Sequence, residues 1–154
     1  AVVAVMLGLD TNVLVRFLVR DDEVQFEKAR KLIKREIAAG RRVFISQLVL
    51  LETEWVLRSR YSLPKHLIIE AISGLLDATD VRFEDEPAIE EALFIWKDTT
   101  ADFADCLIGA RNRRLGCRAT ATFDAKASKL PGFIAATHRQ AGRVMLRLQA
   151  FAMC

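Results

Sequence analysis

The run Val5-Met-Leu-Gly-Leu9, followed at once by Asp10-Thr-Asn12, is the stretch that decides the fold class. Short and almost wholly apolar runs of this kind are typical of strands buried within a parallel sheet. Residues 12–19 continue with helical spacing, so a strand passes directly into a helix. Asp10 is therefore expected at the carboxyl end of a strand, where open α/β sheets bind their ligands.

The same strand-to-helix order recurs along the whole chain. Strands alternating with helices predict an α/β fold, in the form of a three-layer α/β/α sandwich with a central, mainly parallel sheet. Further strands are predicted at 43–45, 81–83, 118–123 and 133–134, and helices at 22–39, 46–60, 64 onward, 87–96, 102–116 and 125–129.

Composition describes one globular domain with little overall charge. The chain has 154 residues and a formal net charge of +3. Residues 137–154 hold three arginines and no acid, so the remaining 20 basic residues balance the 20 acidic ones. Overall basicity therefore gives no argument for nucleic-acid binding. Residues 1–136 are expected to form the domain, with 137–154 either a basic amphipathic helix or a poorly ordered tail.

Cysteine and histidine usage excludes several classes of site. The three cysteines, Cys106, Cys117 and Cys154, lack metal-type spacing, which indicates reduced thiols in a cytoplasmic protein. His66 and His138 stand alone and cannot build a zinc site. No apolar run reaches the ~18 residues that a membrane span needs.

Carboxylates recur at positions where a charge is costly unless it has a partner. Asp10 and Asp124 each follow a predicted strand, and both are expected to project from the same edge of the sheet. Glu52 is expected on the apolar side of its helix, whereas Glu54 and Arg58, spaced i,i+4, are expected to form a surface pair.

Asp102 and Asp105 share one face at the start of a predicted helix. Asp102 can be read as an N-cap or as a ligand, while Asp105 lies among apolar residues, where capping does not explain it. Converging carboxylates without basic partners repel one another unless they bind cations. Mg²⁺ and Mn²⁺ prefer oxygen ligands, so the set predicts a metal-dependent site suited to phosphodiester cleavage.

Four segments, taken in order, resemble the PIN-domain nucleases, and most closely the VapC toxins of toxin–antitoxin pairs. They cover residues 6 to about 134 and read Leu-Asp10-Thr-Asn-Val-Leu-Val-Arg-Phe-Leu, Ile-Ser46 with Leu-Glu52-Thr-Glu-Trp-Val-Leu-Arg, Ala-Asp102-Phe-Ala-Asp105-Cys-Leu-Ile, and Ala-Thr122-Phe-Asp124. The resemblance implies a Mg²⁺- or Mn²⁺-dependent endoribonuclease, usually a homodimer, that a small VapB-like antitoxin protein neutralises.

Residue roles follow from the same resemblance. It implies that Asp10, Glu52, Asp105 and Asp124 are the catalytic, metal-holding acids, with Asp102 accessory. Supporting hydrogen bonds are expected from Thr11, Asn12 and Thr122. Candidates to guide the RNA backbone are Arg16 and Lys126, and the antitoxin is expected to cover the first two helices at Phe17 and Phe26.

Two other readings of the acids are open to test. A catalytically silent PIN-like module would use the fold to bind protein or RNA, although it would be free to lose acids that this chain keeps. A haloacid-dehalogenase-like phosphatase needs an aspartate two residues after the first, and position 12 is Asn. A Rossmann site and a P-loop are excluded because no glycine-rich turn follows the first strand.

Overall fold

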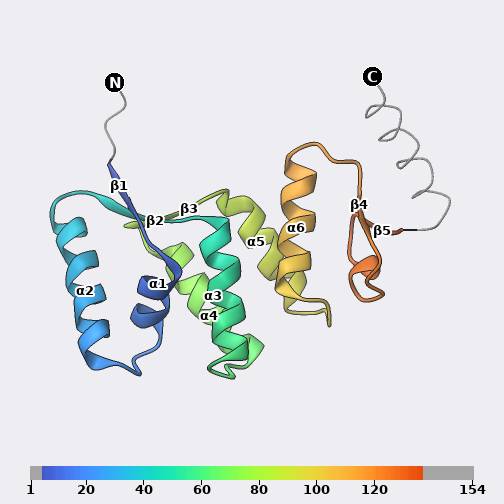
Figure 1. Ribbon diagram of the computed structural model, residues 1–154. Coiled ribbons are helices and arrows are strands. Elements are labelled where there is room, and N and C mark those ends of the chain that lie inside the picture. Colours follow the sequence, from blue (N-terminus) through green and yellow to red (C-terminus); the bar gives the residue numbers. More distant parts are fainter. Residues whose placement is uncertain (1–4, 137–154) are drawn as a thin grey trace, which may run out of the picture.

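The computed structural model describes residues 5–136, so expectations about residues 137–154 lie outside the described part of the chain. Strands and helices alternate as predicted (Figure 1). In order they are β1 (Met6–Gly8), α1 (Thr11–Leu18), α2 (Glu23–Ala38), β2 (Arg42–Ile45), α3 (Gln47–Ser59), α4 (Lys65–Asp77), β3 (Val81–Phe83), α5 (Glu86–Trp96), α6 (Phe103–Arg114), β4 (Thr120–Thr122), the 3₁₀ turn η1 (Ala127–Lys129) and β5 (Phe133–Ala135).

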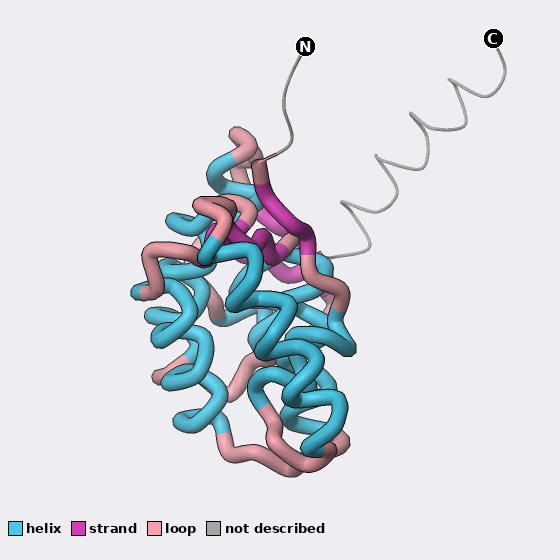
Figure 2. Tube along the Cα trace, turned by 90° about the vertical axis from the view of Figure 1, so that its left-hand side faces the viewer, coloured by secondary structure: helices cyan, strands magenta, loops and turns pink. Residues whose placement is uncertain are grey.

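All described strands pair in parallel, which confirms the predicted α/β class. They form two sheets, one with the order β1-β2-β3 and one that holds only β4 and β5. In the first sheet Leu7 pairs with Val43, and Val43 pairs with Val81. In the view turned by 90° the strands gather toward one end of the molecule and the helices run away from them (Figure 2). The expectation that β1 and β4 share one sheet is therefore wrong for the described residues.

The core lies between the first sheet and the helices that cover it. Leu50 and Leu57 of α3 and Ile68 and Ile72 of α4 are almost fully buried. Each such side chain contributes about 1.5–3 kcal/mol when it leaves water. Phe103 begins α6 in this core, so the helix that carries Asp105 is anchored at its first residue.

The β4–β5 pair is docked on the opposite side of α6 from the first sheet (Figure 1). The ring of Phe133 crosses α6 at Gly109, where an added Cβ would lie 2.4 Å from Phe133 Cε2. Arg113 donates to the carbonyl of Pro131 at 2.6 Å, and Asn112 Nδ2 donates to Thr120 Oγ1 at 3.0 Å. The absence of a side chain at position 109 thus lets the small sheet approach the helix.

No helix within residues 5–136 has both the length and the apolar character that a bilayer crossing requires.

Candidate active site

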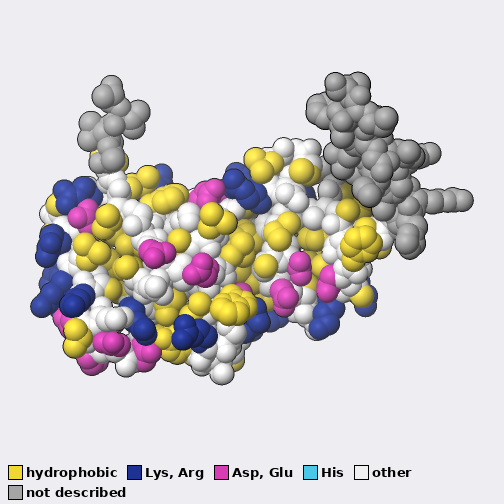
Figure 3. Space-filling model, in the orientation of Figure 1, with side chains coloured by type: hydrophobic (Ala, Val, Ile, Leu, Met, Phe, Trp, Pro, Cys, Tyr) yellow, Lys and Arg dark blue, Asp and Glu magenta, His cyan; other side chains and the backbone are white. Residues whose placement is uncertain are grey.

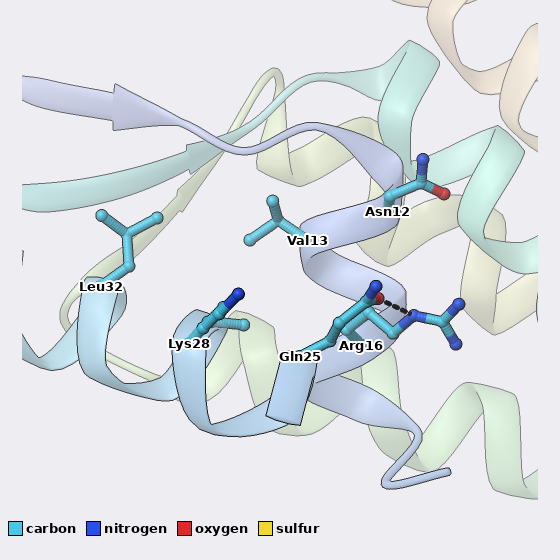
Figure 4. Close-up of a pocket in the computed structure, with 7 residues that line it drawn as sticks. Asn12, Val13, Arg16, Gln25, Lys28 and Leu32 are labelled. Atoms are coloured by element: carbon cyan, nitrogen blue, oxygen red, sulfur yellow. Dashed lines mark hydrogen bonds between the residues drawn. The ribbon is translucent and has the colours of Figure 1, made fainter. Parts of the chain in front are cut away.

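Asp10 lies just past the end of β1, at the N-cap of α1. Its Oδ1 accepts the backbone N–H of Thr11 at 2.8 Å, and the side chain is exposed. The contact is made by the backbone N–H of Thr11 rather than by its hydroxyl, and the Thr11 side chain is buried, so support by that hydroxyl stays a prediction. Asn12 is exposed and lines a pocket between α1 and α2 instead (Figure 4).

Asp102 and Asp105 lie at the start of α6. Asp102 occupies the N-cap position, but its side chain makes no capping hydrogen bond and is exposed. The sequence left open whether Asp102 is an N-cap or a metal ligand, and the hydrogen bond that an N-cap side chain would accept is absent. Asp105 is half-buried in the first turn of the helix, where exposed backbone N–H groups favour negative charge.

Asp105 is the acid whose surroundings oppose its ionisation. Burial raises the pKa of the Asp105 carboxyl, and the negative charges of Asp102 and Asp124 raise it further. Asp102 and Asp124 thus both lie within electrostatic reach of Asp105. Acidic side chains also gather around the lower end of α6 and the β4–β5 pair in Figure 3. A bound cation would favour the ionised form of Asp105 and relieve this repulsion.

Asp124 is held in a tight turn after β4. Its Oδ1 accepts the backbone N–H of Ala127 at 2.7 Å, and its own N–H donates to Thr122 Oγ1 at 3.0 Å. The Thr122 hydroxyl thus contacts the backbone of Asp124, and its predicted support of the Asp124 carboxylate stays a prediction. The Asp124 side chain remains exposed.

The predicted orientation of α3 is wrong. Glu52 is exposed, whereas Glu54 is only 3% exposed and accepts from Arg58 Nε at 2.8 Å. The predicted pair of Glu54 with Arg58 exists, but its carboxylate is buried. Trp55, a large apolar residue three positions after Glu52, is 54% exposed and lies at the surface. Exposure of Glu52 leaves its carboxylate accessible to a ligand.

The acids fit a hard divalent cation in their chemistry, because every candidate ligand is a carboxylate. Their positions, however, do not gather them as the ligands of one ion. Within residues 5–136, no three side chains of the Asp, Glu, His or Cys types come close enough together to hold a metal ion. Asp10 and Asp124 follow strands of different sheets.

The two residues predicted to guide the RNA differ in how far their side chains are already engaged in contacts. Arg16 is already engaged: its guanidinium donates to Gln25 at 2.6 Å (Figure 4), to both oxygens of Asp21 at 3.1 Å and to the hydroxyl of Tyr61 at 3.0 Å. These contacts tie α1 to the end of α3 and leave Arg16 ill-suited to hold a phosphate. Lys126 is exposed beside Asp124.

From the sequence, Arg58 was expected only in a surface pair with Glu54, without a role at the site, and Lys65 was not singled out. The hydrogen bond to Glu54 is the largest cause that raises the pKa of Arg58, and the charge of Asp102 raises it further, so Arg58 lies near the acids of α6. Its i,i+4 spacing from Glu54 was the available signal. Lys65 donates to the carbonyls of Trp96 at 2.9 Å and Thr99 at 2.6 Å. No local pattern could have shown these contacts across more than 30 residues.

Cys106 packs in the core beside these acids. Burial raises the pKa of its thiol to about 11, with a further contribution from the charge of Asp105. A thiol with so high a pKa is a poor nucleophile at neutral pH. Its burial and its high pKa indicate that Cys106 packs the core, whereas Cys117 is an exposed free thiol.

The fold and the order of its acids define a member of a known nuclease-type family. The PIN domain family matches residues 8–132, a span that includes every candidate acid. This chain belongs to the PIN domain family. It is also similar to a VapC ribonuclease of Aquifex aeolicus (strain VF5), with 25% identity over 122 residues that cover 79% of this chain and 90% of the relative.

Proposed function

We propose that the protein is a metal-dependent endoribonuclease toxin of the VapC type. The observation that carries the proposal is the PIN domain match over residues 8–132, because it spans the acids in the order in which they occur. Similarity to a protein named VapC ribonuclease over 79% of the chain supports RNA as the substrate class. The protein would hydrolyse phosphodiester bonds.

Carboxylates would hold one or two divalent cations, Mg²⁺ or Mn²⁺. When bound, such a cation polarises the phosphate and lowers the pKa of an attacking water. The acids proposed to hold it are Asp10, Glu52, Asp105 and Asp124, with Asp102 as an accessory ligand. Thr122 would keep the turn of Asp124 in place through its hydroxyl.

Positive charge beside the acids would position the RNA backbone. Lys126 is exposed two residues after Asp124, and Arg58 lies near Asp102 with 45% of its side chain exposed. The Nε of Arg58 donates a hydrogen bond to Glu54, which fixes the position of the guanidinium. The remaining guanidinium donors of Arg58 could then contact a phosphate.

A cognate VapB-like antitoxin is the proposed inhibitory partner. Phe17 and Phe26, the anchors expected from the sequence, stack on each other with centroids 6.4 Å apart, and both are half-buried. More exposed apolar side chains lie on α3 and α6, including Leu48 at 79%, Trp55 at 54% and Ile108 at 45%. Both surfaces are therefore candidates for the antitoxin.

A silent binding module is the second candidate function. It is favoured by one observation, that no three acids in residues 5–136 are close enough together to share a cation. Such a protein would bind RNA or a partner protein without cleaving it.

Cleavage of total cellular RNA by the antitoxin-free protein separates the two functions. The assay compares Mg²⁺, Mn²⁺ and EDTA, and it compares wild type with Asp10→Asn and with Asp77→Asn, a matched loss of an exposed acid at the end of α4. Discrete cleavage is expected with wild type and Asp77→Asn, and a loss of at least ~100-fold with Asp10→Asn or EDTA. RNA binding without cleavage in any lane would instead establish the silent module.

A further inference from the structure

The outward side of α2 carries a concentration of positive charge. Residues 27–42 hold seven basic and two acidic residues, although residues 1–136 are neutral as a whole. In Figure 3 basic side chains gather at the left of the molecule, over α2. Charge that is concentrated in one place, rather than balanced locally, attracts a ligand of the opposite sign.

Both acids of this stretch are already engaged. Glu27 accepts from Arg30 at 3.0 and 2.9 Å, and Glu36 accepts from Arg41 at 2.6 and 3.0 Å. These pairs neutralise two of the seven basic residues. Four of the remaining five lie on α2, are exposed, and make no ion pair with any residue that the structure describes. These four, which form the basic face of α2, are Lys28, Lys31, Lys34 and Arg35.

The spacing of the four residues places them on one side of the helix. They follow the pattern i, i+3, i+6 and i+7, whereas the residues that α2 buries, Ala29 and Ile33, lie on the other side. At 1.5 Å per residue the face extends for about 10 Å along the helix axis. Like charges three or four residues apart destabilise a helix, and only Arg35 lies in the last turn, where a positive charge is favourable. Helix stability therefore does not account for the three lysines.

One end of the basic face borders a pocket next to the candidate active site. Lys28 of α2 and Asn12 of α1 line this pocket together (Figure 4). Asn12 follows Asp10 by two residues, so the pocket lies beside the carboxyl end of β1. Arg16 also lines the pocket but is paired with Asp21, whereas Lys28 makes no ion pair within residues 5–136. The face thus extends from the edge of the site toward the C-terminal end of α2.

The composition of the basic face fits a phosphate backbone better than a protein surface. Three of its four residues are lysines, which are depleted at protein–protein interfaces but are common contacts of nucleic-acid phosphates. The strongly exposed apolar side chains of α2, Val24 and Ile37, lie outside the span 28–35, so that span offers no apolar anchor for a partner protein. The span also has no aromatic side chain on which a base could stack. Such a face would contact phosphates without reading the base sequence.

We propose that the basic face of α2 binds the phosphate backbone of RNA outside the acidic site. RNA held along the face would pass Lys28 and reach the edge of the site at Asn12. The choice of RNA as the ligand rests on the proposed function, whereas the concentration of charge does not. Each base that contacts a phosphate releases a counterion, so this binding weakens as the salt concentration rises.

RNA binding without cleavage tests the face directly. The full chain is titrated in EDTA into a fluorescein-labelled RNA hairpin with single-stranded flanks, and fluorescence anisotropy gives the Kd from about 50 to about 200 mM KCl. The face variant carries Lys28→Gln, Lys31→Gln and Arg35→Gln. The matched control loses three exposed bases outside α2 that make no ion pair among the described residues, and it carries Arg60→Gln, Arg82→Gln and Lys97→Gln.

The face variant is expected to lose both affinity and salt dependence. Three lost contacts to a single strand lower the slope of log K against log salt by ~2, which amounts to ~100-fold weaker binding at about 0.1 M salt. The control is expected to keep the slope and the Kd of wild type, and both variants are expected to melt as wild type does, because all six positions are exposed. An equal loss in both variants, or unchanged binding by the face variant, would overturn the proposal.

Poly-glutamate serves as a second ligand, because an acidic protein is the other polyanion that such a face could attract. RNA is expected to bind wild type more tightly than poly-glutamate does at equal charge. Tighter binding of poly-glutamate that is lost in the face variant would assign the face to an acidic protein and overturn the proposal.

Cleavage in Mg²⁺ or Mn²⁺ separates this inference from the proposed function. Far below saturation the face variant is expected to cleave RNA ~10–100-fold more slowly than wild type, and at saturation to match it, because the lost contacts are made equally before and during the reaction. If wild type cleaves RNA and the face variant binds it equally well, the nuclease function stands and the basic face fails. If wild type does not cleave but the face variant loses binding, the nuclease function fails and the face stands as an RNA-binding surface.

Discussion

Gly109 is the position at which a single methyl group tests the packing of α6 most directly. An added Cβ would lie 2.4 Å from Phe133 Cε2 and 3.1 Å from Cζ, whereas carbon atoms pack at about 3.5–4.0 Å. Alanine in a helix interior is otherwise more stable than glycine by ~0.5–1 kcal/mol, and overpacking costs ~1–3 kcal/mol. We expect the overlap to dominate, so Gly109→Ala lowers the free energy of unfolding by ~0.5–2 kcal/mol.

Gly74 in α4 is the matched control, because nothing lies within 4 Å of a Cβ built there. Gly74→Ala is expected to raise the free energy of unfolding by ~0.5–1 kcal/mol. Urea unfolding followed by far-ultraviolet circular dichroism measures both, provided that the m-values agree. Opposite signs are the expected result. Equal stabilisation by the two substitutions would refute the packing of Phe133 on α6, and with it the docked position of β4 and β5.

Two further predictions concern charged groups. Arg58→Ala leaves the buried carboxylate of Glu54 without its partner and is expected to lower the free energy of unfolding by ~2 kcal/mol. Glu54→Gln leaves a guanidinium that water can solvate and is expected to lower it by only ~1 kcal/mol. Urea unfolding of both variants and of the double variant measures the coupling, and a smaller loss of stability from Arg58→Ala than from Glu54→Gln would contradict the burial of Glu54. The pKa of Asp105 is raised in the folded state by burial and by its acidic neighbours, so the folded protein binds more protons and its stability falls as the pH rises above the ordinary range of aspartate. In EDTA at pH 7, Asp105→Asn is therefore expected to melt above wild type, with a difference that shrinks below about pH 4; identical melting temperatures at pH 7 would count against this account.

Element positions were predictable because the information is local. Strands and helices are marked by runs and by the spacing of apolar residues, and Ser46 caps α3 as its residue type indicates, accepting from Val49 N at 3.2 Å. The acids at the ends of β1 and β4 could be found in the same way, since Asp10 directly follows an apolar run and Asp124 directly follows the predicted strand 118–123.

Orientation and strand order were not predictable, for different reasons. Helix α3 carries apolar residues on almost every side, so its buried face is set by contacts with other elements; Leu50 and Leu57 point inward while Leu48 and Trp55 point outward. The same orientation of α3 buries Glu54, whose carboxylate accepts a hydrogen bond from Arg58. The neighbour of β4 depends on contacts made after the chain has folded back on itself, and Gly109, which lets Phe133 dock, has no local signature of this role.

The two hydrogen bonds from Lys65 bear on how substitutions of the acids are interpreted. Its ammonium holds the carbonyls of Trp96 and Thr99 just before Asp102, so α4 fixes the turn that aims the start of α6. The position of the first turn of α6 is thus set in part by hydrogen bonds from Lys65, in which no acid takes part. Neutral replacements at 102 and 105 leave the Lys65 contacts in place, whereas a replacement of Asp105 also changes the interaction of its carboxylate with the backbone of Asp102, so the variant at 102 reports more directly on chemistry.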